Sequence, residues 1–191
     1  MIAFIGSKRA VIAGDKREIA FQGDPSATER LETELYSGQI VTDATLLRRA
    51  KELGILLRIR DTKDKIQERN GILIGEVSDF EGGILRKRRL YATMGKFALA
   101  ELEGSHMEVI QEGEGSKFIF LGNDITKKIA YDLIQKEWKN GSLSDAVLVI
   151  RNIMEAAARK TASVSKTYEI RETHSRGDIR KLIEIDHDSG R

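Results

Sequence analysis

The 191-residue sequence contains no cysteine, a single proline and only three histidines. The lack of cysteine excludes disulfides, thiol catalysis and zinc–thiolate sites. The histidines (His106, His174 and His187) share no metal-ligand spacing, so we predict neither a metal site nor a cofactor. No apolar run approaches the roughly 18 residues of a membrane span, and no signal peptide is visible. These absences predict a soluble, cytoplasmic protein without membrane insertion.

Neither sign of charge is in large excess, because the sequence has 32 basic and 30 acidic residues and a formal net charge of +2. Bulk charge therefore does not favour nucleic-acid binding. The exception is a cationic run, residues 86–89 (RKRR), inside a predicted strand. We interpret the run either as an edge strand protected by charge or as a docking site for an acidic substrate segment. No aromatic residues interleave with it, so we predict no nucleic-acid partner.

The apolar pattern predicts an α+β domain without the βαβ alternation of a Rossmann fold. Two antiparallel sheets between helical layers explain the order better. The expected strands are, by residue number, 2–5, 10–13, 18–22, 55–60, 65–69, 71–77, one opened by Gly82-Gly83, 97–103, 107–111, 117–121 and a last central strand at 164–170. The expected helices follow Asp24-Pro25, Thr42-Asp43, residues 123–124 and Ser144-Asp145, with Asn140-Gly141 separating the last two. Asn70-Gly71 is the strongest hairpin signal.

The first seventeen residues form a predicted β-hairpin that ends in Asp15-Lys16-Arg17. By itself, this ending is typical of a solvated strand end. A strand, a tight turn and a strand ending in A-x-D-[KR]-R also resembles the opening of a proteasome β subunit. In that superfamily, the N-terminal nucleophile hydrolases, the first strand carries the catalytic residue on its free end.

The superfamily's chemistry needs a lysine that biases the terminal amine and hydroxyl, and an aspartate that holds this lysine. Asp15 falls at the position of that aspartate. Lys65 is the best candidate for the lysine, because residues 65–79 (KIQERNGILIGEVSD) resemble the K-I-x-x strand of proteasomes, and Lys63 is the fallback. Residues 25–54 between them read as an inserted helical pair.

A third segment, residues 159–163 (RKTAS), is similar to the R-D-V-A-S segment that supports the terminal amine in proteasome β subunits. Ser163 matches the serine, whereas Lys160 replaces the aspartate. Without the resemblance, Ser163 is a polar residue after a helix. Residues 121–124 (LGND) fit either an oxyanion loop or a helix cap.

Together, these segments resemble connectase, the archaeal protein ligase of methanogens that is related to proteasome β subunits. The resemblance is carried by residues 2–19, 35–43, 75–91 and 121–134. It implies a four-layer αββα sandwich over residues 1–171. The residue pattern itself places the helical insertion at about 25–54 and a polar tail at 172–191, in which Ile179, Leu182, Ile183 and Ile185 could form an extra strand. The resemblance also implies transpeptidation: an N-terminal Thr or Ser attacks a Lys-Asp-Pro-Gly-Ala-type sequence, and a second polypeptide's amine resolves the acyl-enzyme. The family's partner is the A subunit of the methanogenic membrane methyltransferase complex.

The sequence departs from this family at its start. Met1 falls where the family has its second apolar residue, so the nucleophile is expected two positions upstream. A start codon assigned late, a shortened chain or an inactive relative would each explain this, and the first two fit the otherwise intact pattern better. The chain as it stands is expected to be inactive. Family members usually carry a further C-terminal domain, which the chain's end does not reach.

Two non-enzymatic interpretations remain open from the sequence. One is a non-catalytic, proteasome-like module that binds protein. The other is a structural subunit of a proteasome-like ring, which would need large apolar side surfaces and an extra N-terminal helix, and neither is evident.

Overall fold

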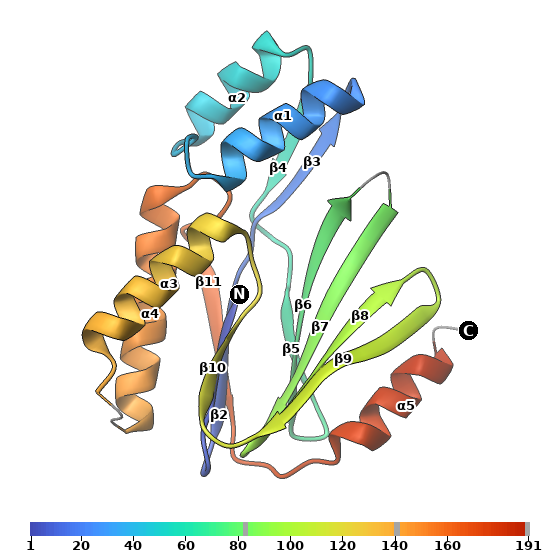
Figure 1. Cartoon of the computed structure of the whole chain (residues 1–191), viewed down its shortest axis with the longest axis vertical. Helices are drawn as coiled ribbons and strands as arrows, with labels where there is room; N and C mark the ends of the chain where they lie inside the picture. The colour runs from blue at the N-terminus through green and yellow to red at the C-terminus, as the bar shows by residue number, and fades with distance from the viewer. Residues whose placement is uncertain (82–83, 140–141, 190–191) are drawn as a thin grey trace. The chain divides into compact units, whose positions relative to one another are not determined.

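The computed structural model describes residues 1–81, 84–139 and 142–189 (Figure 1). Over these residues the chain is a mixed α/β protein with five helices and eleven strands in three sheets. It divides into two compact units. We call Met1–Gly14, Lys65–Leu121 and Ile170–Arg191 the sheet unit, and Asp15–Asp64 and Gly122–Glu169 the helix unit. The predicted combination of helices with antiparallel sheets is confirmed.

Most of the strands belong to the sheet unit, in two sheets. The four-stranded sheet has the order β10 (Lys117–Phe120), β1 (Ile2–Ile5), β2 (Ala10–Asp15), β11 (Tyr168–Thr173). The five-stranded sheet has the order β5 (Ile66–Arg69), β6 (Ile72–Glu81), β7 (Ile84–Thr93), β8 (Lys96–Glu103), β9 (His106–Glu114). The opening hairpin is confirmed, because β1 pairs antiparallel with both β2 and β10.

Side chains on successive strand residues point to opposite faces, and each sheet turns one apolar face to a shared core. Ala3, Ile5 and Ile12 of the four-stranded sheet pack against Leu73 and Leu90 of the five-stranded sheet. The opposite face of the five-stranded sheet carries a second cluster, which includes the first apolar turn of helix α5 (Ile179–Ser189). The buried core therefore holds β1 and its free end in place.

Helix α5 corrects one prediction. The alternative of an extra strand within residues 172–191 is wrong, because Ile179, Leu182 and Ile183 recur at i, i+3 and i+4 and lie in one apolar cluster. The last strand also differs from its prediction. It begins at Tyr168 rather than at residue 164, and β11 is an edge strand rather than a central one.

The interpretation of the cationic run as a protected edge strand is wrong, because β7 is the middle strand of its sheet. Acidic side chains on the neighbouring strands neutralise the run. The ion pairs are Arg86–Glu103, Lys87–Glu76, Arg88–Glu101 and Arg89–Glu76, at 3.6, 3.3, 2.9 and 2.7 Å. A central strand can therefore carry four consecutive cations when its neighbours carry the acids.

Turn predictions are confirmed where the structure describes the residues. Asn70 and Gly71 join β5 to β6 with φ of 52° and 76°, the left-handed values that this hairpin turn requires. The predicted strand opening at Gly82-Gly83 and the predicted break between two helices at Asn140-Gly141 lie outside the described residues.

The helix unit contains a two-stranded sheet, β3 (Glu18–Gln22) with β4 (Leu56–Arg60), and four helices. Helices α1 (Pro25–Tyr36) and α2 (Asp43–Glu52) start at the predicted caps Asp24 and Thr42, and share an apolar cluster with β3 and β4. Helices α3 (Asp124–Glu137) and α4 (Leu143–Lys160) pack together. The cap of α4 is Ser142 in a capping box, not the predicted Ser144. In the part of the chain that the structure describes, every helix is too short or too polar to cross a membrane.

Candidate functional site

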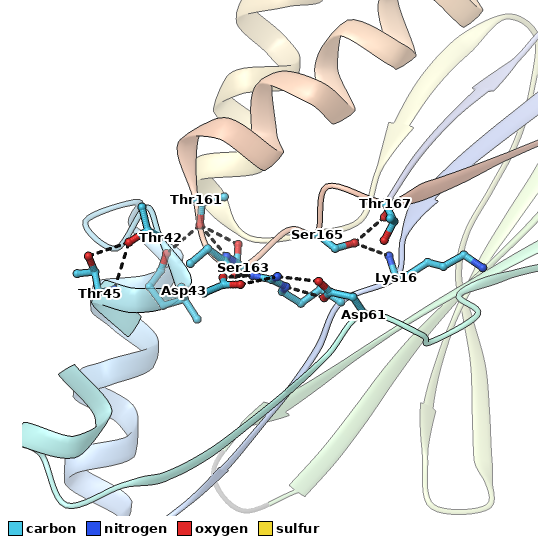
Figure 2. Close-up of polar contacts among 12 residues, drawn as sticks. Lys16, Thr42, Asp43, Thr45, Asp61, Thr161, Ser163, Ser165 and Thr167 are labelled. Carbon is cyan, nitrogen blue, oxygen red and sulfur yellow. Dashed lines mark hydrogen bonds and ion pairs between the residues drawn. The ribbon is translucent and has the colours of Figure 1, made fainter. Parts of the chain in front are cut away.

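Three segments that carry predicted site residues meet at one peptide group of the helix unit, that of Lys16 (Figure 2). The Lys16 N–H donates to the Ser165 hydroxyl at 3.0 Å and lies 3.3 Å from the Thr167 carbonyl oxygen, which also accepts it. The Lys16 carbonyl accepts from the N–H of Lys63 at 3.1 Å. Residue 16 directly follows Asp15, the other two partners closely follow Ser163, and Lys63 precedes Lys65 by two residues. The fold therefore gathers these segments from across the sequence.

The next residue, Arg17, is a buried ionic centre. Its guanidinium makes two hydrogen bonds to Asp61, at 2.8 and 2.9 Å, and two to Asp43, at 2.5 and 3.1 Å. It also donates to the Ala162 carbonyl at 2.6 Å. The hydrogen bonds to Asp61 and Asp43 raise the pKa of Arg17, although burial opposes this. One side chain thus ties the start of β3, the first turn of α2, the end of β4 and the loop after α4 together.

The predicted site residue Ser163 lies in that loop and belongs to a chain of hydroxyls. The side-chain oxygen of Asn123 accepts from the N–H of Thr126, so its amide nitrogen donates to the Ser163 oxygen, at 2.9 Å. The Thr161 hydroxyl donates to the Leu35 carbonyl at 3.4 Å and lies 2.9 Å from the Ser163 oxygen. Either of these two hydroxyls can donate to the other.

Asp15 is the last residue of β2, and Lys65 directly precedes β5. Asp15 is buried, whereas Lys65 is half-buried. The Lys65 Cβ lies 3.4 Å from the point where a Cβ on Gly14 would be, so Lys65 packs beside this position of β2. The fallback candidate, Lys63, forms an ion pair with Glu18 at 3.0 Å.

The N-terminus and the predicted oxyanion loop are linked through Leu121. The Met1 amine donates to the Leu121 carbonyl at 2.9 Å, and the Leu121 N–H donates to the Met1 carbonyl at 3.1 Å. The Leu121 N–H is therefore occupied. Asn123 is the N-cap of α3, as the helix-cap interpretation expects. The Met1 sulfur fills the space over Gly75, 2.2 Å from where a Cβ would lie.

Sequence reasoning missed the roles of Arg17, Asn123 and Ser165. Arg17 stands in the quoted opening motif, but its acidic partners lie 26 and 44 residues away. No local pattern reveals such distances. The Asn123 cap was visible in the sequence, whereas its bond to a hydroxyl 40 residues later was not. Within residues 1–81, 84–139 and 142–189, the side chains form no group of three or more His, Asp or Glu that would hold a metal ion.

A family model described as "Connectase MJ0548-like, N-terminal domain" matches residues 1–188. No curated protein matches the chain. Since the family match covers nearly all of the sequence, the chain belongs to the connectase family and corresponds to its N-terminal domain.

Proposed function

We propose that this chain is the catalytic domain of a protein ligase that forms peptide bonds by transpeptidation. A Thr or Ser two positions upstream of Met1 is the nucleophile, and the substrate is a Lys-Asp-Pro-Gly-Ala-type sequence in a protein. The proposal includes the four-layer architecture of N-terminal nucleophile hydrolases. Membership of the connectase family supports the ligase activity. The register of β1 is the observation that supports the position of the nucleophile.

On one side, β1 pairs with β2 in an antiparallel register that joins Ile2 to Ala13. An extension of β1 with the same register has its first upstream residue opposite Asp15 and its second opposite Lys16. The second residue is the proposed nucleophile. It would therefore adjoin the peptide group at which the site segments meet.

On the other side, β1 pairs with β10 in a register that joins Ile2 to Phe120. The two hydrogen bonds between Met1 and Leu121 continue this ladder by one residue. A further extension of two residues reaches Asn123, which holds Ser163. Both neighbours of the proposed nucleophile are thus bonded to the loop that follows α4.

The proposed nucleophile and the proposed lysine also lie on the same face of the sheet. Residues directly opposite in an antiparallel pair share a face, so the side chain of the second upstream residue lies on the same face as those of residues 1 and 14. Lys65 lies against Gly14 on that face. We therefore assign Lys65 to the nucleophile's hydroxyl. The roles proposed for Asp15, which holds the charge of Lys65, and for Ser163, which supports the terminal amine, rest on the resemblance to N-terminal nucleophile hydrolases.

The proposed reaction proceeds in two balanced steps. The hydroxyl oxygen attacks a carbonyl carbon of the substrate, its proton passes to the terminal amine, and the amine returns a proton to the departing peptide nitrogen. An ester-linked acyl-enzyme remains. The amine of a second polypeptide then attacks the ester, and its proton restores the hydroxyl, so one peptide bond replaces another. We propose the methyltransferase A subunit of a methanogenic archaeon as the natural partner, met in the cytoplasm.

The test extends the chain upstream by Thr-Val, released from a cleavable tag so that the Thr amine is free, with Ala-Val as the matched control. Each protein is incubated with a peptide that contains Lys-Asp-Pro-Gly-Ala and analysed by intact mass. We expect an acyl adduct on the Thr-Val chain only, and its transfer to a second peptide with a free amine. A folded Thr-Val chain without adduct or ligated product would overturn the proposal and favour the protein-binding module.

A further inference from the structure

The two-stranded sheet of the helix unit has two different faces. Alternate residues of β3 and β4, such as Phe21 and Leu57, are partly buried against α1 and α2. The other alternate residues form what we call the outer face: Glu18, Ala20, Gln22, Leu56, Arg58 and Arg60. Five of these six are exposed, and Glu18 is partly buried. Helices thus cover one face of the sheet, and the other is open.

The open face is positively charged. Arg58 and Arg60 make no ion pair or side-chain hydrogen bond with the described residues, and their direct cross-strand neighbours are Ala20 and Glu18. Glu18 is engaged with Lys63 at 3.0 Å. Two guanidinium groups with their full set of donors therefore stand side by side on one strand.

This arrangement differs from that of the other cations in the chain. The cationic run at residues 86–89 was considered as a docking site from the sequence. Each of its members, however, is neutralised by an acid on a neighbouring strand. Arg58 and Arg60 lack such partners, although arginines elsewhere in the unit, such as Arg17 and Arg49, have them. Leu56, on the same face, is 67% exposed. The face thus combines unmatched positive charge with an apolar contact point.

We propose that the outer face of β3 and β4 binds an extended, acidic segment of the protein substrate. Residues i and i+2 of a strand are about 6.6 to 6.8 Å apart on one face, and an extended peptide repeats its side chains at the same interval. Carboxylates at alternate positions therefore match Arg58 and Arg60, each of which can bind one through two parallel hydrogen bonds. Leu56 receives an apolar residue of the same segment. This inference rests on the proposed function only in naming the partner as the substrate.

Peptide binding tests the inference without any chemistry. The probe is a fluorescein-labelled ten-residue peptide of alternating Glu and Val, compared by anisotropy with a Lys–Val peptide of equal length. We expect the 191-residue chain to prefer the acidic probe and to lose this preference between about 0.05 and 0.5 M salt. The variant Arg58→Glu/Arg60→Glu should weaken binding of the acidic probe about tenfold or more, and the milder Arg58→Gln/Arg60→Gln should weaken it less.

The matched control is Arg151→Glu/Lys128→Glu, which makes the same change in net charge at two exposed positions of α4 and α3. It should change the affinity for the acidic probe less than about twofold, because bulk charge acts only weakly at a distance in salt. Equal loss in both double variants, or equal binding of the two probes to the unmodified chain, would overturn the inference.

Ligation assays separate this inference from the proposed function. In the Thr-Val chain, Arg58→Glu/Arg60→Glu should raise KM for a Lys-Asp-Pro-Gly-Ala peptide flanked by acidic residues and leave kcat unchanged. Probe binding without any ligation would refute the proposed reaction and retain the docking face. Ligation with the same KM in the double variant would refute the docking face alone.

Discussion

Each unit of the molecule is organised around a buried ionic centre, and the two centres have opposite sign. In the sheet unit the centre is an acid, Asp186 of α5, which accepts hydrogen bonds from Tyr91 at 2.7 Å, from Arg89 at 3.0 Å and from Arg69. In the helix unit it is a base, Arg17. Both side chains are almost fully buried, at 5% and 6% exposed. Both join elements that the sequence separates widely.

The partners of the two centres differ in their access to water. Asp43 and Asp61 are 52% and 39% exposed, so they would be hydrated if Arg17 were lost. Tyr91 is fully buried, so its hydroxyl would lose its acceptor without Asp186, whereas Arg89 would keep its ion pair with Glu76. The loss of a polar partner destabilises a protein most when it leaves a buried group unpaired. The free-energy cost of removing a buried charged side chain therefore depends on whether its former partners can be hydrated.

The largest effect is expected for Asp186→Ala. Removal of this carboxylate leaves the buried Tyr91 hydroxyl without its acceptor and Arg89 with Glu76 alone, and a buried group that loses its partner costs about 3 kcal/mol. We expect the free energy of unfolding, from guanidinium denaturation followed by circular dichroism, to fall by about that amount.

The matched control for this variant is Asp188→Ala, on the same helix. Its side chain is highly exposed and its weak contact is with His187, so the change should be below about 0.5 kcal/mol. Similar losses for the two variants would show that the Asp186 cluster does not hold α5.

A smaller effect is expected for Arg17→Met. The apolar chain retains much of the arginine's packing, and Asp43 and Asp61 can regain water, so we expect a loss of about 2 kcal/mol in the same assay. The exposed Arg48→Met is the control, since the side chain of Arg48 is largely solvated. A loss as large as that of Asp186→Ala would contradict the rule that exposed partners recover their hydration.

Neither centre was visible in the sequence, for a physical reason. Periodicity and caps report neighbours within a turn of helix or a tight hairpin, which is why α1, α2, α4 and the Asn70-Gly71 turn were predicted correctly or within two residues. The partners of Asp186 are 95 to 117 residues away, and those of Arg17 are 26 to 145 residues away. Such contacts depend on how the elements pack.

The errors have the same origin. The run at residues 86–89 was interpreted as an edge because its acidic partners, such as Glu76 and Glu101, stand on other strands. Helix α5 was considered as a strand because Ile183 and Ile185 also fit a period of two. Packing selects the helix, since Ile179 and Leu182 are buried together. For the candidate site, the sequence predicted the three segments but not the Lys16 peptide group at which they meet.

The third prediction concerns pH and the acid centre. Burial, as the largest cause, and the hydrogen bond to Asp186 raise the pKa of Tyr91 to about 12, against an ordinary value of 10.0. The folded state therefore favours the protonated phenol. Its contribution to stability is fully present below pH 10 and is lost as the pH rises toward 12.

Absorbance at 295 nm should show one of the four tyrosines ionising near pH 12, and Tyr91→Phe should remove that step. Loss of Asp186 should lower the pKa of Tyr91, because the carboxylate disfavours a second negative charge beside it. A Tyr91 that ionises near pH 10 would contradict the view of a buried acid centre coupled to Asp186.

The smallest effect on stability, and the most specific, is expected next to the base centre, for Asn123→Asp in the Thr-Val chain. Aspartate caps a helix as well as asparagine does, so the free energy of unfolding should change by less than about 0.5 kcal/mol. Aspartate cannot donate to Ser163, however, and it adds a negative charge beside the proposed terminal amine. That charge favours the protonated amine, which cannot act as a base.

The acidic limb of the ligation rate against pH should therefore move upward by about half a unit to one unit, with the rate restored at higher pH. Asn123→Ser, a neutral cap, should leave the limb in place. Asp186→Ala should also leave it in place despite its larger effect on stability. If the limb moves equally in all three variants, it reports general destabilisation. Asn123 would then have no part in setting the pKa of the terminal amine.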